Sequence, residues 1–303
     1  MARILTGVQS TGIPHLGNII GAIIPAIKMA EDEMNESFLF IADLHSITQI
    51  KDCNELSEHT FATAATWLAC GLNPEKTIFF RQSAVAQVTE LAWFLSCFFP
   101  YQRLKLAHSF KDKSDHLGDV NCGLFTYPML MASDILIYNA ELVPVGKDQL
   151  QHIEITRDVA SRFNHQFGET FVLPKAKIEE NTQYVTGTDG EKMSKSKNNT
   201  INIFLQEKKL RSQIMSIKTD SKSIDEPKNP DQCNLFKLFS ILGNKNQIDV
   251  LRQKYLNGGV GYGDTKQELF ELILEKFKTE RTKFKYYNEN PREVELALEK
   301  GAY

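Results

Sequence analysis

Short apolar runs alternate with longer segments of helical periodicity through the first half of the chain. Four such runs, at residues 3–8, 37–42, 77–82 and 142–145, are bounded by turn residues and are too short for helices. We interpret them as strands. Because strands that alternate with helices pair in parallel, the pattern predicts an α/β fold with a parallel sheet.

Two helical segments in this half have different patterns. Residues 18–29 are apolar on most faces, as expected for a helix packed against a sheet, and Pro25 is a candidate site for a bend. Residues 149–163 are amphipathic, with Ile155, Val159 and Phe163 at steps of four.

The strand signals stop beyond about residue 203. Helical patterns follow at residues 204–217, 232–242, 247–255 and 266–278. Thr265 and Glu268 predict a capping box at the start of the last of these helices. A helical domain appended to a sheet domain is therefore expected, and the sequence has no internal repeat or low-complexity tract.

Composition adds few constraints. With 35 Lys and Arg against 38 Asp and Glu among 303 residues, the net charge of -3 gives no global electrostatic argument for nucleic acid, so any RNA contact must come from a local patch. Five scattered cysteines without a Cys-x-x-Cys pair argue against zinc ribbons and iron–sulfur clusters. No signal peptide or membrane-length apolar run is present, which predicts a soluble cytoplasmic protein.

A glycine-rich turn follows the first apolar run. Residues 11–18 read Thr-Gly-Ile-Pro-His-Leu-Gly-Asn and lead into a helix, whose N-terminus would face an anion. His15 and Asn18 could donate hydrogen bonds to phosphate or ribose. Taken alone, the pattern fits a tight strand-to-helix turn equally well.

A lysine-rich loop lies past the middle of the chain, with Lys192-Met193-Ser194-Lys195-Ser196 between Gly187 and Asn199. When a carboxylate attacks the α-phosphorus of ATP, negative charge builds on the leaving pyrophosphate, and cations stabilise it. That reaction needs no protein nucleophile, and the sequence has no Gly-x-Ser-x-Gly elbow. A solvated surface loop is the alternative interpretation.

Together the two segments resemble the paired signatures of class I aminoacyl-tRNA synthetases, His-Ile-Gly-His and Lys-Met-Ser-Lys-Ser. The second signature is matched in all five positions, whereas the first ends in Asn18 in place of the frequent histidine. The resemblance implies a Rossmann-type catalytic domain at residues 1–185, the signature loop at 186–202 and a helical anticodon-binding domain at 203–303. Residues 280–303 could pack back on the catalytic domain, and because the family usually continues further, a truncation after Tyr303 is considered.

Asp134 is the one charged residue in the otherwise nearly apolar segment 124–138. A buried carboxylate needs a partner, and the indole N–H of tryptophan, which only donates, would suit it. Met131, Val143 and Val145 could line a flat slot around the ring. A structural aspartate satisfied by backbone groups is the alternative from the residues alone.

Residues 131–136, 143–152 and 156–158 resemble segments of bacterial-type tryptophanyl-tRNA synthetases. The resemblance implies these tryptophan-binding residues: Asp134, Met131, Gln149, His45, Val143, Val145 and Gln9. It implies these ATP-binding residues: Gln9, Ser10, Thr11, Gly17, Asn18, Gly146, Lys147, Asp148, Val185, Lys192, Met193, Ser194, Lys195 and Ser196. Lys192, Lys195 and Lys113 are the implied catalytic residues, with a surface lysine as the alternative for Lys113. Lys147 replaces a usual acidic residue, so the resemblance implies no side-chain role there and leaves room for backbone contacts only.

The implied activity is that of a tryptophan–tRNA ligase. L-tryptophan and ATP, with Mg²⁺, would give tryptophanyl-adenylate and pyrophosphate, and the tryptophanyl group would pass to tRNA(Trp). The family is homodimeric, and the aromatic residues of segment 93–101 are expected in the core and subunit interface. No membrane or DNA partner is expected. No protein-held metal is expected either, since His15, His45 and His152 lack metal-site spacing. A tyrosyl-tRNA synthetase and a non-catalytic paralogue that binds tryptophan or tRNA are the alternatives.

Overall fold

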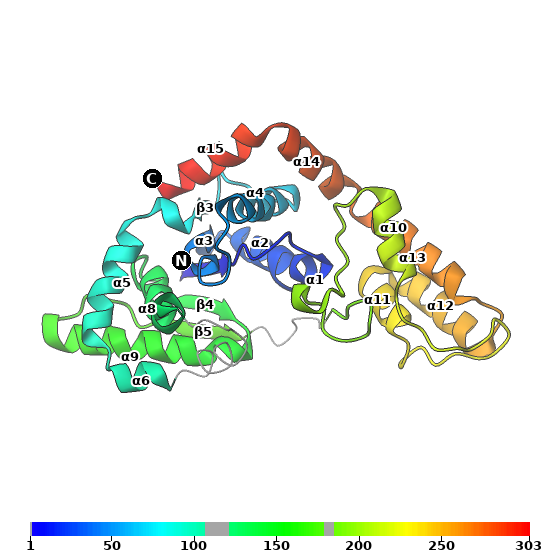
Figure 1. Cartoon of the computed structure of the whole chain (residues 1–303), viewed down its shortest axis with the longest axis horizontal. Helices are drawn as coiled ribbons and strands as arrows, with labels where there is room; N and C mark the ends of the chain where they lie inside the picture. Colours follow the sequence, from blue (N-terminus) through cyan, green and yellow to red (C-terminus); the bar gives the residue numbers. More distant parts are fainter. Residues whose placement is uncertain (1, 107–120, 179–184) are drawn as a thin grey trace.

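Five parallel strands form one sheet, in the order β3-β2-β1-β4-β5. We describe residues 2–106, 121–178 and 185–303 of a computed structural model (Figure 1). The strands are β1 (Ala2–Val8), β2 (Asn35–Ile41), β3 (Ile78–Arg81), β4 (Leu142–Val145) and β5 (Lys175–Ile178). Strand order reverses between β1 and β4, and in such sheets ligands bind outside the carboxyl ends of the strands at this point.

The predicted parallel α/β fold is confirmed. Each of the four predicted strands lies within two residues of its expected bounds. The fifth strand, β5, was missed because its sequence Lys-Ala-Lys-Ile is polar and largely exposed at the sheet edge. A short edge strand of this kind leaves no clear apolar alternation.

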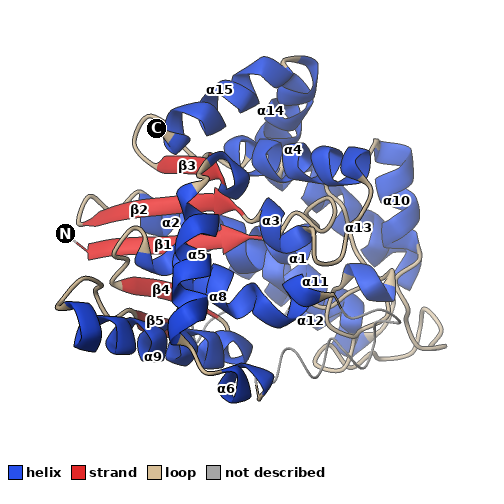
Figure 2. Cartoon of the chain, turned by 60° about the vertical axis from the view of Figure 1, so that its left-hand side comes forward, coloured by secondary structure: helices blue, strands red, loops and turns tan. Residues whose placement is uncertain are grey.

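Both faces of the sheet are covered by helices (Figure 2). The helices of this region are α1 (Leu16–Asn18), α2 (Ile24–Ala30), α3 (Asp43–Ser46), α4 (Cys53–Ala69), α5 (Gln87–Phe98), α6 (Tyr101–Lys105), α8 (Cys122–Leu136) and α9 (Leu150–Phe167). Phe38 and Phe40 of β2 share a core cluster with Ile135 of α8, whereas Leu39 shares another with Trp67 of α4. Successive residues of a strand face opposite sides, which accounts for the almost wholly buried sequence of β2.

The predicted helix at residues 18–29 is continuous but irregular. It passes from α1 through a π-helical turn, Ile19–Ile23, into α2, and the N–H of Ile24 donates to the carbonyl of Ile19. Pro25, which has no N–H to extend an α-helical ladder, directly follows this turn. The local irregularity at Pro25 is therefore a π-helical turn.

The helical region gathers at one end of the molecule, at the right of Figure 1. It contains α10 (Glu207–Met215), α11 (Asn234–Leu242), α12 (Lys245–Asn257) and α13 (Tyr262–Lys276). The capping box predicted at Thr265 is wrong, because α13 begins at Tyr262 and the Thr265 hydroxyl donates to the carbonyl of Gly261 inside its first turn. Helix α12 carries a capping box instead, formed by Asn244 and Gln247.

The last two helices return from this end to the sheet. Helix α14 (Lys278–Glu289) packs against α4, and α15 (Pro291–Ala302) packs along β3, as Figure 1 shows. Arg81 of β3 forms an ion pair with Glu295 of α15. The edge of the sheet at β3 is therefore covered, while domain boundaries at residues 185 and 202 stay predictions.

Within the described ranges, no helix has the length and apolar character needed to cross a membrane.

Candidate active site

Two adjoining cavities open at the carboxyl ends of β1 and β4, where strand order reverses. The first, which we call the aspartate cavity, has a volume of about 520 Å³ and is lined by Asp134. The second, the lysine cavity, has a volume of about 970 Å³ and is lined by Lys192 and Lys195. Gln9, Gln49 and Gly146 line both cavities. A ligand in one cavity can therefore reach a ligand in the other.

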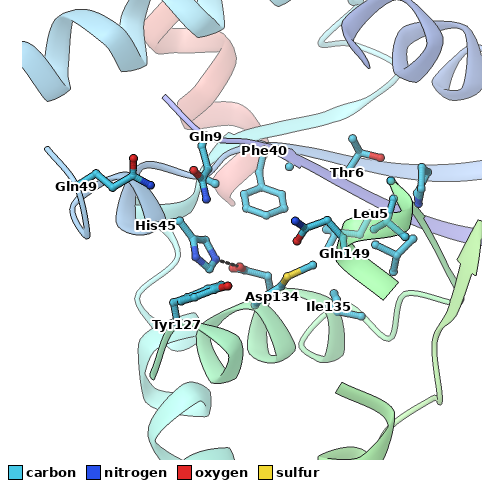
Figure 3. Close-up of a pocket in the computed structure, with 17 residues that line it drawn as sticks. Leu5, Thr6, Gln9, Phe40, His45, Gln49, Tyr127, Asp134, Ile135 and Gln149 are labelled. Atoms are coloured by element: carbon cyan, nitrogen blue, oxygen red, sulfur yellow. Dashed lines mark hydrogen bonds and ion pairs between the residues drawn. The ribbon is translucent and has the colours of Figure 1, made fainter. Parts of the chain in front are cut away.

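All seven residues predicted to bind tryptophan line the aspartate cavity. They are Gln9 from the end of β1, His45 from α3, Met131 and Asp134 from α8, Val143 and Val145 from β4, and Gln149 from the turn before α9. Figure 3 shows Gln9, His45, Asp134 and Gln149 around the same space. The apolar part of the cavity wall also includes Leu5, Phe40 and Ile135.

Asp134 is buried and bound by two side chains. Its Oδ2 lies 2.9 Å from His45 Nε2 (Figure 3), and the Gln82 amide nitrogen lies 2.8 Å from Oδ1 and 2.9 Å from Oδ2. Burial raises the pKa of Asp134 above its ordinary value, and hydrogen bonds from His45 and Gln82 oppose that rise. An ionised carboxylate only accepts, so His45 donates through Nε2.

Two polar residues near this carboxylate, Tyr127 and Gln82, were not predicted from the sequence. Tyr127 lines the cavity, packs edge-on against the His45 ring and lies 2.9 Å from His152 through its hydroxyl. Gln82 is fully buried behind Asp134. Tyr127 lies in the segment 124–138 that drew attention to Asp134, whereas no motif distinguishes Gln82 from other glutamines.

The lysine cavity collects most residues predicted to bind ATP. Lining it are Gln9, Thr11, Gly17, Asn18, Gly146, Lys147, Asp148, Val185, Lys192, Met193, Ser194, Lys195 and Ser196. Ser10 lies outside it, because this buried residue bonds to Ser46 and accepts from the Thr60 hydroxyl at 3.0 Å. Ser10 therefore anchors the turn between Gln9 and Thr11. Lys113 falls outside the described residues.

The two signature segments contact each other directly. Lys195 Nζ donates to the carbonyl of Gly12 at 2.6 Å, and the N–H of Gly17 lies 3.4 Å from the sulfur of Met193. The N–H of Leu16 also donates to the carbonyl of Ile201 at 2.8 Å. The lysine loop is therefore held against the start of the first helix.

His15 and Lys195 have pKa values shifted by burial. Burial, with a smaller contribution from Lys195, lowers the pKa of His15 to about 4. The His15 ring is therefore neutral near pH 7, and its Nδ1 accepts from the N–H of Asn18 in a reciprocal cap. Burial also lowers the pKa of the Lys195 ammonium to about 8.

The lysine loop is ordered by Asn199, which is 2% exposed. Its amide nitrogen donates to Asp189 at 2.7 Å and to the carbonyl of Lys192 at 3.1 Å, while its amide oxygen accepts from the N–H of Ser194 at 2.8 Å. An added side chain at Gly187 would collide with Asn199. One side chain thus fixes the backbone on both sides of Met193.

Among the described residues, no group of three or more His, Cys, Asp or Glu side chains could hold a metal ion. The polar side chains of the lysine cavity are mainly lysines, hydroxyls and amides, with Asp148 as a carboxylate. These donors suit an anion better than a cation.

Comparisons with known proteins identify the family of the chain. The family model for class I tRNA synthetases (W and Y) matches residues 1–278. The tryptophan–tRNA ligase of Fusobacterium nucleatum is 46% identical over 303 residues, covering 100% of this chain and 92% of that protein.

Solved structures match over the same extent. The crystal structure of tryptophanyl-tRNA synthetase from Campylobacter jejuni complexed with ADP and tryptophan has a TM-score of 0.95 and 43% identity, covering 99% of this chain and 93% of that chain. The crystal structure of tryptophanyl-tRNA synthetase from Mycoplasma pneumoniae has a TM-score of 0.79 and 28% identity, covering 100% of this chain and 92% of that chain. From its sequence, fold and site, the chain belongs to the class I tRNA synthetases of the W and Y family.

Proposed function

We propose that this chain is a tryptophan–tRNA ligase, which joins L-tryptophan to tRNA(Trp) through tryptophanyl-adenylate. The observation that carries the proposal is the buried Asp134 carboxylate in a cavity with apolar walls and a few polar groups, which adjoins a lysine-lined cavity. An indole N–H can only donate, and Asp134 offers a fixed acceptor for it. The full-length relatives named as tryptophan–tRNA ligases favour this reading over a tyrosyl enzyme.

Tryptophan would fill the aspartate cavity with its ring between apolar walls. Met131, Val143 and Val145 border this space, and Gln149 and Tyr127 would face the amino-acid backbone. Gln9, which lines both cavities, would lie beside the carboxylate that reacts. The cavity volume of about 520 Å³ falls within the range of small-molecule sites.

ATP would occupy the lysine cavity with its triphosphate toward Lys192 and Lys195. A tryptophan carboxylate oxygen attacks the α-phosphorus, the bond from that phosphorus to the bridging oxygen breaks, and pyrophosphate leaves with the electron pair. The two lysines would stabilise the charge that builds on pyrophosphate. The hydroxyls of Ser194 and Ser196 and the backbone of the first signature complete the anion site.

Mg²⁺ would enter with ATP, held by phosphate oxygens and water. Among the described residues that line the lysine cavity, Asp148 is the one carboxylate, which supports this arrangement. Lys113, predicted to help hold the triphosphate, stays a prediction.

In the second step, a ribose hydroxyl of the terminal adenosine of tRNA(Trp) attacks the adenylate carbonyl, and AMP leaves. The helices α10–α13 are proposed to read the anticodon, at the end of the molecule opposite α5 and α9 in Figure 1. Charging of tRNA(Trp) would take place in the cytoplasm, where translation uses the charged tRNA.

A homodimer is also proposed. Trp93 and Phe94 of α5 are 70% and 48% exposed, and Tyr101 of α6 and Phe167 of α9 are exposed nearby on the same helical layer. Large exposed aromatic groups of this kind mark association surfaces. Sedimentation should show a dimer that Trp93→Glu dissociates, and a monomeric wild-type protein would contradict the assignment.

Aminoacylation tests the whole reaction. Purified protein, ATP and Mg²⁺ are mixed with tRNA(Trp) or tRNA(Tyr) and either tryptophan or tyrosine, and acid-stable aminoacyl-tRNA is counted. We expect charging only with tryptophan on tRNA(Trp). Charging with tyrosine would assign the tyrosyl activity, and binding of tryptophan without charging would favour the non-catalytic paralogue.

A further inference from the structure

Gln82 lies directly after β3, on the far side of Asp134 from the cavity. It is fully buried and does not line the aspartate cavity. Its amide nitrogen lies 2.8 Å from Oδ1 and 2.9 Å from Oδ2 of Asp134. Its amide oxygen accepts from the N–H of Leu44 at 3.1 Å and from that of His45 at 3.4 Å.

These neighbours allow one orientation of the Gln82 amide. A carboxylate requires the donating nitrogen, and two backbone N–H groups require the accepting oxygen. Leu44 and His45 lie in the first turn of α3, whose N–H groups lack partners within the helix. Gln82 therefore joins a helix N-terminus to the Asp134 carboxylate, and polarisation by the N–H groups strengthens its own donation.

The donors are divided unequally between the two carboxylate oxygens. In the described part of the chain, Oδ2 receives both Gln82 and His45, while Oδ1 receives Gln82. Each carboxylate oxygen has about two lone-pair positions for hydrogen bonds. Oδ1 is therefore the oxygen with the remaining capacity for a donor from the cavity.

We propose that Gln82 is a positioning residue for substrate selection, which fixes the Asp134 carboxylate so that Oδ1 accepts the ring N–H of the bound amino acid. This inference rests on the proposed function. It adds a residue that touches no substrate but determines how strongly the enzyme prefers rings that carry an N–H. Without Gln82 the buried carboxylate would keep the His45 contact on Oδ2 but lose its donor on Oδ1 and part of its stabilisation as an anion.

Gln82→Met tests the proposal, because methionine has a similar length and no donor. KM and kcat are measured in pyrophosphate exchange for tryptophan and for β-(3-benzothienyl)alanine, in which sulfur replaces the ring N–H. We expect the KM for tryptophan to rise ~10- to 100-fold, the range for hydrogen bonds to charged groups, with a much smaller change in kcat. The KM for the sulfur analogue should change little.

A double-mutant cycle separates action through Asp134 from a general loss of packing. In Asp134→Asn, which removes the ionised acceptor, Gln82→Met should raise the KM for tryptophan far less than in the wild-type background. Equal effects in both backgrounds would overturn the proposal.

Ser133→Ala is the matched control. Ser133 is buried beside Asp134, and its hydroxyl donates to the carbonyl of Val88 at 2.6 Å, not to the carboxylate. This variant should lower thermal stability and keep the preference for tryptophan over the sulfur analogue. If Ser133→Ala also lost that preference, removal of any buried polar side chain in this region would have the same effect, and Gln82 would have no specific role.

The wild-type protein supplies an independent measurement if Gln82→Met does not fold. In a crystal structure with tryptophan, the indole nitrogen should lie within hydrogen-bond distance of Oδ1, with both Gln82 contacts kept. An indole bound to Oδ2, or a Gln82 amide turned away from Asp134, would overturn the proposal. Wild-type protein that does not activate tryptophan would instead refute the proposed function.

Discussion

Lys195 links the two signature segments and has a pKa close to physiological pH. Its ammonium donates to the carbonyl of Gly12 at 2.6 Å, so a cation of the second signature rests on the backbone of the first. Burial lowers the pKa of this ammonium to about 8, close to physiological pH. A bound triphosphate would compete with Gly12 for the cation and would restore its preference for the charged form.

Replacement of this cation should affect rate more than tryptophan binding. Lys195→Ala is expected to lower kcat for adenylate formation by about 10²- to 10³-fold, as for loss of one group that stabilises transition-state charge. The Kd for tryptophan, measured by equilibrium dialysis, should stay within a few-fold. An equal loss in tryptophan binding would contradict the assignment.

The pH dependence follows from the same group. Because the pKa of Lys195 is lowered to about 8, the free enzyme loses this charge as pH rises through 8, well before an ordinary lysine would. We expect kcat/KM for ATP to fall between about pH 7.5 and 9.5 in the wild type. Lys195→Arg, which stays protonated, should flatten that limb of the profile, and an unchanged decline would exclude Lys195 as its source.

At the scale of elements, the lysine loop is a preformed structure. Asn199 binds Asp189, the carbonyl of Lys192 and the N–H of Ser194 from a buried position. The Asn234 amide also donates to the carbonyl of Gly187 at 2.8 Å, which ties the loop to α11. The loop therefore presents its lysines with little conformational freedom left to lose on binding.

Removal of the Asn199 amide should loosen the loop. Asn199→Leu keeps much of the volume but leaves buried backbone groups without partners, so we expect kcat for adenylate formation to fall ~10-fold or more. The KM for tryptophan should change little. Asn198→Gly is the control, since Asn198 is exposed and has a φ of 51°, which glycine adopts freely. Similar losses in both variants would show general sensitivity of the loop.

Helix α15 depends on a close approach to β3. A side chain at Gly301 would collide with the backbone of Phe79. Phe79 lies within β3, so its backbone cannot easily move away. Gly301→Ala is expected to lower the free energy of unfolding by about 1–3 kcal/mol, measured by urea denaturation. Lys300→Ala removes the exposed ion pair to Glu75 and should cost less than about 1 kcal/mol. Equal costs would mean that α15 does not rest on β3 as described.

At the scale of the whole molecule, the sequence predicts the architecture better than the boundaries. Apolar runs such as residues 38–41 of β2 gave clear signals, because the part of a strand that is covered on both faces is apolar on both. Lys175–Ile178 gave none, since an exposed edge strand needs few apolar residues. The start of α13 was misplaced because Thr265 is a capping residue type that here lies buried within the helix.

Site residues that belong to sequence motifs could be predicted, whereas those that depend on contacts between distant elements could not. Residues recognised from motifs lie around the two cavities. The first signature follows β1 and the segment from Gly146 follows β4, the two strands that meet where strand order reverses, and the lysine loop contacts the first signature. Gln82 escaped because its importance depends on β3 lying beside α3 and α8, a juxtaposition no local pattern encodes. Ser10 shows the converse, since its place directly before the first signature does not reveal that its hydroxyl faces Ser46 and Thr60.

The most direct test of tryptophan selection through Asp134 is amino-acid-dependent exchange of labelled pyrophosphate into ATP. Each of the twenty amino acids is supplied alone to the wild-type protein and to Asp134→Asn, which keeps the shape of the side chain. We predict exchange with tryptophan alone, reduced by at least ~10-fold at subsaturating tryptophan in the variant. Exchange driven by another amino acid, or undiminished tryptophan exchange in Asp134→Asn, would contradict the account.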